Sequence, residues 1–168
     1  MNLPLQTATF AAGCFWGVEA AFRGRPGVIR TAVGYTGGSV DDPTYEQVCV
    51  GATGHAEAVE VEYDPDVISY SELLEVFWSE HDPTTRNRQG WDIGSQYRSA
   101  IFTHGDEQTA DAIASRDARQ SKTRRPIVTE VVPADRFWMA EDYHQQFFEN
   151  AGNNGSCAVS LGVPGLDA

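Results

Sequence analysis

The alternation of apolar and polar residues along the chain predicts strands and helices in turn. Val59, Val61 and Tyr63 share one face of residues 56–63, and glutamates stand between them, which is the two-residue period of a half-buried strand. Similar short apolar or alternating runs predict the other strands. We expect strands over residues 7–12, 28–35, 56–63, 97–103 and 127–132.

Helices are predicted where apolar residues recur every three or four positions. Ser69 and Glu72 form a capping box ahead of Leu73, Leu74 and Phe77, so a helix should follow. We expect helices over residues 15–23, 45–50, 69–80, 106–121 and 140–150. Because helices and strands alternate loosely around a β-rich middle, the pattern favours an α+β fold, a mixed sheet covered by helices, over a doubly wound parallel sheet.

Polar segments without periodicity predict the loops. Residues 82–96 form a long polar loop interrupted by proline and glycine, and loops of that length are often functional. From residue 151 the chain is rich in glycine and asparagine. No repeat, low-complexity run or linker divides the 168 residues. We therefore expect one domain over residues 1–168, with a core of about 7–150 and a flexible tail over 151–168.

Composition and charge narrow the class of protein. No apolar run reaches about 18 residues, so a membrane-spanning helix is not expected. The first ten residues lack the basic residues and apolar run of a secretory signal, which favours a cytoplasmic protein. Twelve basic residues stand against 24 acidic ones, a net charge of −12, and Arg124–Arg125 is the one notable basic pair. Nucleic acid is therefore not an expected partner.

The cysteines are three in number and far apart: Cys14, Cys49 and Cys157. A disulfide framework needs an even, denser set, and structural zinc needs closely spaced pairs, so we expect no metal. The thiols are either inert buried residues or redox-active ones. Cys49, between two valines, has the surroundings of a structural residue. Cys157, in the tail, stands where a thiol could swing toward another sulfur.

Cys14 is placed where a predicted strand passes into a helix. A sulfur there lies near unpaired backbone N–H groups at the positive end of the helix dipole, which lowers a thiol pKa from about 8.5. The thiolate is the nucleophilic form. Phe15 and Trp16 would then form an apolar wall beside the sulfur, although ordinary core packing explains them equally well.

Glu57 is a candidate proton donor. Strand alternation places it on the apolar face of residues 56–63, where burial raises a carboxyl pKa and keeps the proton. If the strand begins one residue later, Glu57 is a solvated loop residue instead. His55 and Glu57 also match half of a zinc deaminase signature, but no Pro-Cys-x-x-Cys follows. Tyr45 and Tyr97, at the starts of elements, could donate hydrogen bonds to a substrate oxygen.

Nine short segments, taken in order, resemble the A-type peptide methionine sulfoxide reductases over residues 10–148. They are Gly-Cys-Phe-Trp-Gly at 13–17, Gly-Tyr-Thr-Gly-Gly at 34–38, Pro-Thr-Tyr at 43–45, Gly-His-Ala-Glu-Ala-Val at 54–59, His-Asp-Pro at 81–83, Arg-Gln-Gly at 88–90, Gln-Tyr-Arg-Ser at 96–99, Glu-Asp at 141–142 and His-Gln-Gln at 144–146. The resemblance implies a two-layer α/β sandwich with a ferredoxin-like core, a single catalytic domain and repair of oxidised methionine.

The resemblance also implies roles for individual residues. Cys14 would attack the sulfoxide sulfur and become a sulfenic acid, and Glu57 would protonate the oxygen, to which Tyr45 and Tyr97 hydrogen-bond. Phe15 and Trp16 would receive the substrate methyl group, with Asp92 and His144 nearby. Cys157 would condense with the sulfenic acid into a disulfide that thioredoxin reduces.

The implied substrates are methionine-S-sulfoxide in oxidised proteins and as the free amino acid. The implied protein is a cytoplasmic monomer without a cofactor. Two departures from the family stand out: Trp91 replaces the usual asparagine, and the tail has a single cysteine in an atypical sequence. A peroxide-reducing thiol protein and a non-enzymatic thiol redox sensor are the alternatives, and either would oxidise Cys14 without producing methionine.

Overall fold

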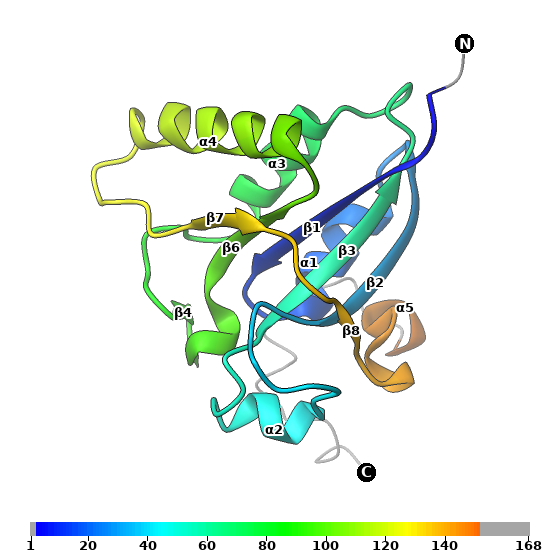
Figure 1. The fold of residues 1–168 in the computed structure, drawn as a ribbon, viewed down its shortest axis with the longest axis vertical. Coiled ribbons are helices and arrows are strands. Elements are labelled where there is room, and N and C mark those ends of the chain that lie inside the picture. Colours follow the sequence, from blue (N-terminus) through cyan, green and yellow to red (C-terminus); the bar gives the residue numbers. More distant parts are fainter. Residues whose placement is uncertain (1–2, 152–168) are drawn as a thin grey trace.

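Within residues 3–151, which the computed structural model describes, six strands form one mixed sheet in the order β7-β6-β1-β3-β2-β8 (Figure 1). Neighbouring strands are antiparallel except for β6 and β7, which are parallel. The strands are β1 (Gln6–Ala12), β2 (Val28–Thr36), β3 (Ala56–Tyr63), β6 (Ser99–Thr103), β7 (Glu130–Pro133) and β8 (Trp138–Met139).

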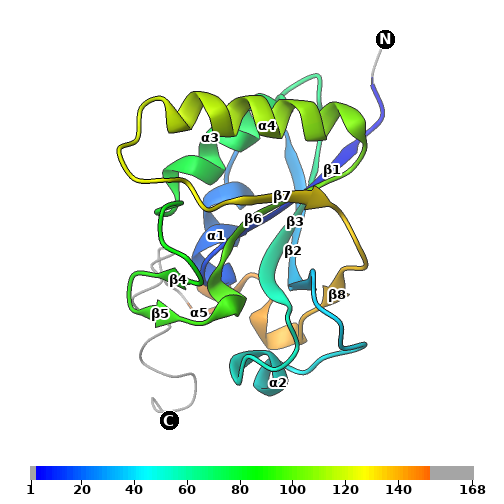
Figure 2. The same ribbon diagram turned by 60° about the vertical axis from the view of Figure 1, so that its left-hand side comes forward.

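The centre of the sheet has the split β-α-β arrangement of a ferredoxin-like fold. The element order β1-α1-β2-β3-α3-β6 gives the central strand order β6-β1-β3-β2. Figure 2 shows α4 beside α3 and α2 at the opposite end of the molecule. The helices are α1 (Phe15–Arg23), α2 (Tyr45–Cys49), α3 (Tyr70–Ser79), α4 (Asp106–Gln120) and α5 (Phe147–Ala151). The predicted α+β class is confirmed.

The two faces of β3 pack against different layers. Val59, Val61 and Tyr63 are fully buried in the main core, which also contains Phe22 of α1 and Phe77 of α3. The opposite face is lined by small residues because the chain crosses it closely. A methyl group on Gly34 of the neighbouring strand would lie 2.4 Å from the backbone oxygen of Trp138. Ala56 and Ala58 of β3 lie on that face and pack with Phe137, which comes just before β8.

Local capping explains where two helices begin. The Ser69 hydroxyl accepts a hydrogen bond from the Glu72 amide, which is one half of the predicted capping box, and α3 starts at the next residue. Thr44 and Gln47 form a full capping box at the start of α2. The N-cap of α2 is thus Thr44, and Asp42, two residues earlier, adopts a left-handed turn conformation with φ of 45°.

The prediction of one helix over residues 140–150 is wrong. A 3-10 turn at Asp142–His144 and the short helix α5 are separated by Gln146, whose φ is 49°. Other bounds shift as well: Tyr97 lies in a 3-10 turn (Ser95–Tyr97) ahead of β6, and β7 starts at Glu130. The 82–96 loop contains a hairpin of β4 (Arg88–Gln89) and β5 (Asp92–Ile93).

No helix in the described part of the chain is both long and apolar enough to cross a membrane.

Candidate active site

Cys14 is the N-cap residue of α1. After β1 ends, Gly13 turns the chain with φ of 99°, and a side chain there would collide with Gln89 of the β4–β5 hairpin. The thiol therefore stands at the amino end of a nine-residue helix, where unpaired N–H groups and the helix dipole favour a thiolate. Cys14 is only 6% exposed.

Glu57 lies on the buried face of β3, at the end of the sheet where α1 begins. Its side chain is 1% exposed, and its Oε1 accepts a hydrogen bond of 3.2 Å from the Phe15 amide. The interpretation of Glu57 as a solvated loop residue is therefore wrong. The Glu57 carboxyl group is thus held at the same helix terminus as Cys14, by the amide of Phe15, the residue that follows Cys14.

Tyr45 and Tyr97 are half-buried close to Glu57. Burial raises the pKa of both phenols, and ionisation of Glu57 would raise it further. The charge of Cys14 acts on Tyr97 in the same direction. Both hydroxyls are thus protonated at neutral pH and can donate a hydrogen bond to an oxygen atom in the site.

His144 organises the aromatic residues around the thiol. The Trp16 indole donates a hydrogen bond of 2.9 Å to its Nδ1, and its ring lies 4.3 Å from that of Tyr45 and 5.2 Å from that of Phe15. Burial lowers the pKa of His144 to about 4. The ring is therefore neutral at physiological pH, and because an indole can only donate, the proton resides on Nε2. His144 fixes Phe15 and Trp16 as an apolar wall.

Glu141 and Tyr35 were not predicted as site residues. The Tyr35 hydroxyl donates to Glu141 Oε1 at 2.8 Å, and the Tyr45 amide donates to Oε2 at 2.9 Å. Burial opposes ionisation of Glu141, but these hydrogen bonds outweigh it, so the pKa of Glu141 is lowered. Glu141 thereby positions the first residue of α2. Both residues belong to segments that resemble the family, and that resemblance could have identified them as site residues.

The segment that carries Glu141 and His144 is anchored by two glutamines. Gln145 bonds both the amide and the carbonyl of Val33 in β2, each at 2.8 Å. The backbone and side-chain N–H groups of Gln146 donate to the buried Glu19 of α1, at 2.8 and 2.9 Å. These contacts connect the segment to both the sheet and the helix of Cys14.

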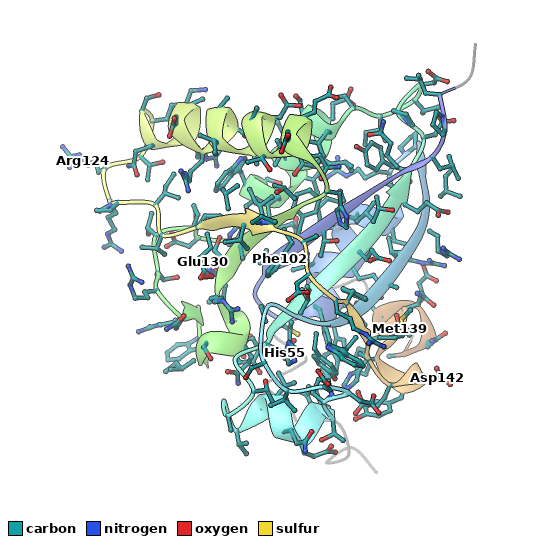
Figure 3. All side chains as sticks on the ribbon, viewed as in Figure 1. His55, Phe102, Arg124, Glu130, Met139 and Asp142 are labelled. Atoms are coloured by element: carbon teal, nitrogen blue, oxygen red, sulfur yellow. The ribbon has the colours of Figure 1, made fainter. Side chains whose placement is uncertain are left out.

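His55 has a structural role at the end of the sheet. In Figure 3 it lies between β3 and α2. Its Nδ1 accepts a hydrogen bond from the Gly38 amide at 2.9 Å, and its Nε2 lies 2.6 Å from the carbonyl oxygen of Val40. Both ring nitrogens are thus used to hold the 38–40 loop. Among residues 3–151 no group of three or more His, Cys, Asp or Glu is arranged to hold a metal.

The remaining predicted residues lie at the rim or outside the described chain. Asp92 is half-buried on β5, burial raises its pKa, and its charge acts on Tyr97. Cys49, at the end of α2, is exposed, unlike a core residue, and its thiol hydrogen-bonds with the Tyr45 side chain. Protein atoms around the sulfur partly desolvate it and raise the pKa of Cys49, and the bond to Tyr45 opposes that rise. Cys157 lies outside the described residues.

Comparison with known proteins identifies the family of this chain. A family model described as peptide methionine sulfoxide reductase matches residues 6–164. The peptide methionine sulfoxide reductase MsrA of Methanoculleus marisnigri is 60% identical over 155 residues, which are 91% of this chain and 94% of that protein.

Solved structures have the same fold. The reduced form of Mxr1 from Saccharomyces cerevisiae superposes with a TM-score of 0.86 at 35% identity, over 94% of this chain and 92% of that one. A crystal structure of Mxr1 in complex with Trx2 matches with a TM-score of 0.62 at 26% identity, over 88% of each chain. The chain belongs to the peptide methionine sulfoxide reductase family, and it is a methionine sulfoxide reductase.

Proposed function

We propose that the protein reduces methionine-S-sulfoxide, in oxidised proteins and as the free amino acid, and that Cys14 accepts the oxygen. One observation carries this assignment. The Cys14 thiol caps α1, while the Glu57 carboxyl is bonded to the amide of the next residue, Phe15. A nucleophile and a proton donor thus share one helix terminus, in a setting from which water is largely excluded.

The proposed step transfers one oxygen atom. Sulfoxide oxygen leaves poorly until it is protonated, so Glu57 delivers a proton to it while the Cys14 thiolate attacks the sulfur. The hydroxyl then passes to Cys14, and methionine departs. In balance, the thiol and the sulfoxide give a Cys14 sulfenic acid and methionine: the cysteine sulfur loses two electrons and the sulfoxide sulfur gains them.

The surrounding side chains orient the sulfoxide. Tyr45 and Tyr97 donate hydrogen bonds to its oxygen and add no competing negative charge. Phe15 and Trp16 receive the methyl group, and the His144 contact to the indole supports this wall. Asp92 lies on the hairpin beside Tyr97 and lines the entrance. The electrons come from the thiol, so we propose no metal or other cofactor.

Regeneration requires a second thiol. We propose that Cys157 attacks the sulfenic acid, which releases water and forms a disulfide with Cys14, and that thioredoxin then reduces this bond. The complex of the yeast relative with Trx2 supports such a partner. Cys49 is the alternative, because its thiol already lies against Tyr45. Peptide mapping after one turnover without reductant shows which of the two cysteines resolves the sulfenic acid. We expect a disulfide between Cys14 and Cys157, and a disulfide between Cys14 and Cys49 would contradict the assignment.

The oxygen-transfer step is tested by a single turnover with excess enzyme. Wild type should form one methionine per disulfide, whereas a peroxide-reducing protein or a redox sensor would form the disulfide without methionine. Cys14→Ser should form none. Glu57→Gln should slow methionine release and leave Cys14 alkylatable, and an unchanged rate would refute the acid role of Glu57. The proposed enzyme is a single-domain cytoplasmic monomer, and its mass in solution tests the oligomeric state.

A further inference from the structure

The short helix α2 carries Tyr45 and depends on other segments for its position. It has five residues, of which Tyr45 is the first and Val48 is the one that is buried. A helix of little more than one turn has few internal hydrogen bonds and is only marginally stable by itself. The position of the Tyr45 phenol therefore depends on the contacts that hold the two ends of α2.

Side chains from two distant segments bind these ends. At the first residue, the Tyr45 amide donates a hydrogen bond of 2.9 Å to Glu141 Oε2. At the last residue, the Cys49 carbonyl accepts a hydrogen bond of 3.2 Å from Gln96 Nε2. The Cys49 thiol in turn hydrogen-bonds with the Tyr45 side chain. The end of α2 that Gln96 holds thus lies against the phenol itself.

Gln96 is fixed by the turn that carries the second phenol. It is 4% exposed and directly precedes Tyr97 in the 3-10 turn. The Tyr97 amide closes this turn with a hydrogen bond of 3.0 Å to the Gly94 carbonyl, and a methyl group on Gly94 would collide with the Gln96 amide. Among residues 3–151 the Oε1 of Gln96 has no hydrogen-bond partner, so the bond to Cys49 is the polar contact that this amide contributes there.

We propose that Gln96 is a positioning residue that sets the place of Tyr45 relative to Tyr97, so that both hydroxyls point at the sulfoxide oxygen. The inference rests on the proposed function, in which the two phenols donate hydrogen bonds to that oxygen. A donor stabilises the transition state only if it lies within hydrogen-bond distance of the oxygen that gains charge. A small displacement of α2 should therefore slow the chemical step and leave the apolar wall in place.

The test measures methionine formation from free methionine-S-sulfoxide in a single turnover with excess enzyme. Gln96→Met keeps the length of the side chain and removes its N–H donor. Loss of one donor to a developing oxyanion costs about 10²–10³ in rate, so a donor that is only displaced should cost about tenfold at saturation. The half-saturating concentration should change less than about twofold, because Phe15 and Trp16 still receive the methyl group.

Gln108→Met is the matched control. Gln108 is also buried, at 7% exposed, and its Nε2 also donates to a backbone carbonyl, that of Thr7 at 2.9 Å. Thr7 lies near the start of β1, at the opposite end of that strand from Cys14. The control should therefore keep the wild-type rate, although it loses the same kind of bond.

A double-mutant cycle shows whether Gln96 acts through Tyr45. Tyr45→Phe should slow the reaction about a hundredfold, because the donor itself is lost. Adding Gln96→Met should then slow it less than about twofold further, since no hydroxyl remains to be displaced. A merely structural role of Gln96 would lower the rate by the same factor in both backgrounds.

Three outcomes would overturn the inference: an unchanged rate in Gln96→Met, an equal loss of rate in Gln108→Met, or the same factor with and without the Tyr45 hydroxyl. Gln96→Glu is the second variant if Gln96→Met does not fold. Its ionised carboxylate cannot donate to the Cys49 carbonyl, so it should also slow the reaction. Failure of the proposed function is distinguishable, because wild type would then form no methionine or Tyr45→Phe would keep the wild-type rate.

Discussion

Removal of the Glu19 carboxylate should both destabilise the protein and loosen its active site. Glu19 is 1% exposed on the inner face of α1. It accepts hydrogen bonds from the Thr31 hydroxyl at 2.7 Å and from the two N–H groups of Gln146 at 2.8 and 2.9 Å. Gln146 is two residues from His144, which holds Trp16. Glu19→Ala should therefore loosen the apolar wall of Phe15 and Trp16, although Glu19 does not belong to that wall.

The magnitude follows from what the substitution leaves behind. Truncation deprives the buried Thr31 hydroxyl and two partly buried N–H groups of Gln146 of a charged acceptor, and each such bond contributes about 1.5–3 kcal/mol. The losses are not additive, since water and Gln146 can rearrange, so we expect about 3–5 kcal/mol, less than the sum of the three bonds. Glu19→Gln keeps the shape and one acceptor oxygen, and should cost about 1–2 kcal/mol.

Urea unfolding and steady-state kinetics measure the two effects. Glu149→Ala is the matched control, because Glu149 also bonds α1, through Arg23 at 2.7 Å, but is 60% exposed. It should cost less than about 1 kcal/mol. Glu19→Ala should also raise KM for the sulfoxide, while Glu149→Ala should not. If Glu19→Ala destabilises no more than Glu149→Ala, or leaves KM unchanged, the 145–146 anchor does not support the site.

Two further predictions concern the pH dependence of stability and the substitution of two glycines by alanine. Burial lowers the pKa of His81 and His144 from 6.5 to about 4, so the unfolded chain binds protons in that window that the folded chain does not. Stability should therefore fall as pH decreases from about 6.5 to 4. The urea unfolding midpoint of His81→Asn should fall less steeply over this pH range than that of wild type. Equal pH dependence of the two midpoints would contradict this explanation. Gly38→Ala places a methyl group 2.4 Å from backbone atoms of Thr53 and His55, and should cost more than about 3 kcal/mol. Gly51→Ala, at φ of 78° with open space around it, should cost about 1 kcal/mol in thermal or urea unfolding; equal losses would argue against the steric explanation.

Elements fixed by local physics could be predicted from the sequence. The period of β3 placed Glu57 on the buried face, and the Ser69 cap defined the start of α3. The helix predicted over residues 15–23 is α1, with the same bounds. The sequence could not reveal Glu141 as the partner of Tyr35 and Tyr45, because 106 and 96 residues separate them from it.

The failure at residues 140–150 has the same physical origin. The pattern there favours a helix by a few tenths of a kcal/mol per residue. A helix would withdraw the Gln145 side chain from Val33 of β2 and the Gln146 N–H groups from Glu19. The Val33 carbonyl would keep its bond from the Ala140 amide, but the Val33 amide would lose its partner. Each lost bond costs about 1–3 kcal/mol, and together the losses outweigh the summed helical preference. The observed 3-10 turn also places Glu141 and His144 against the aromatic residues. Long-range hydrogen bonding thus decides both the local conformation of residues 140–150 and the geometry of the apolar wall beside Cys14.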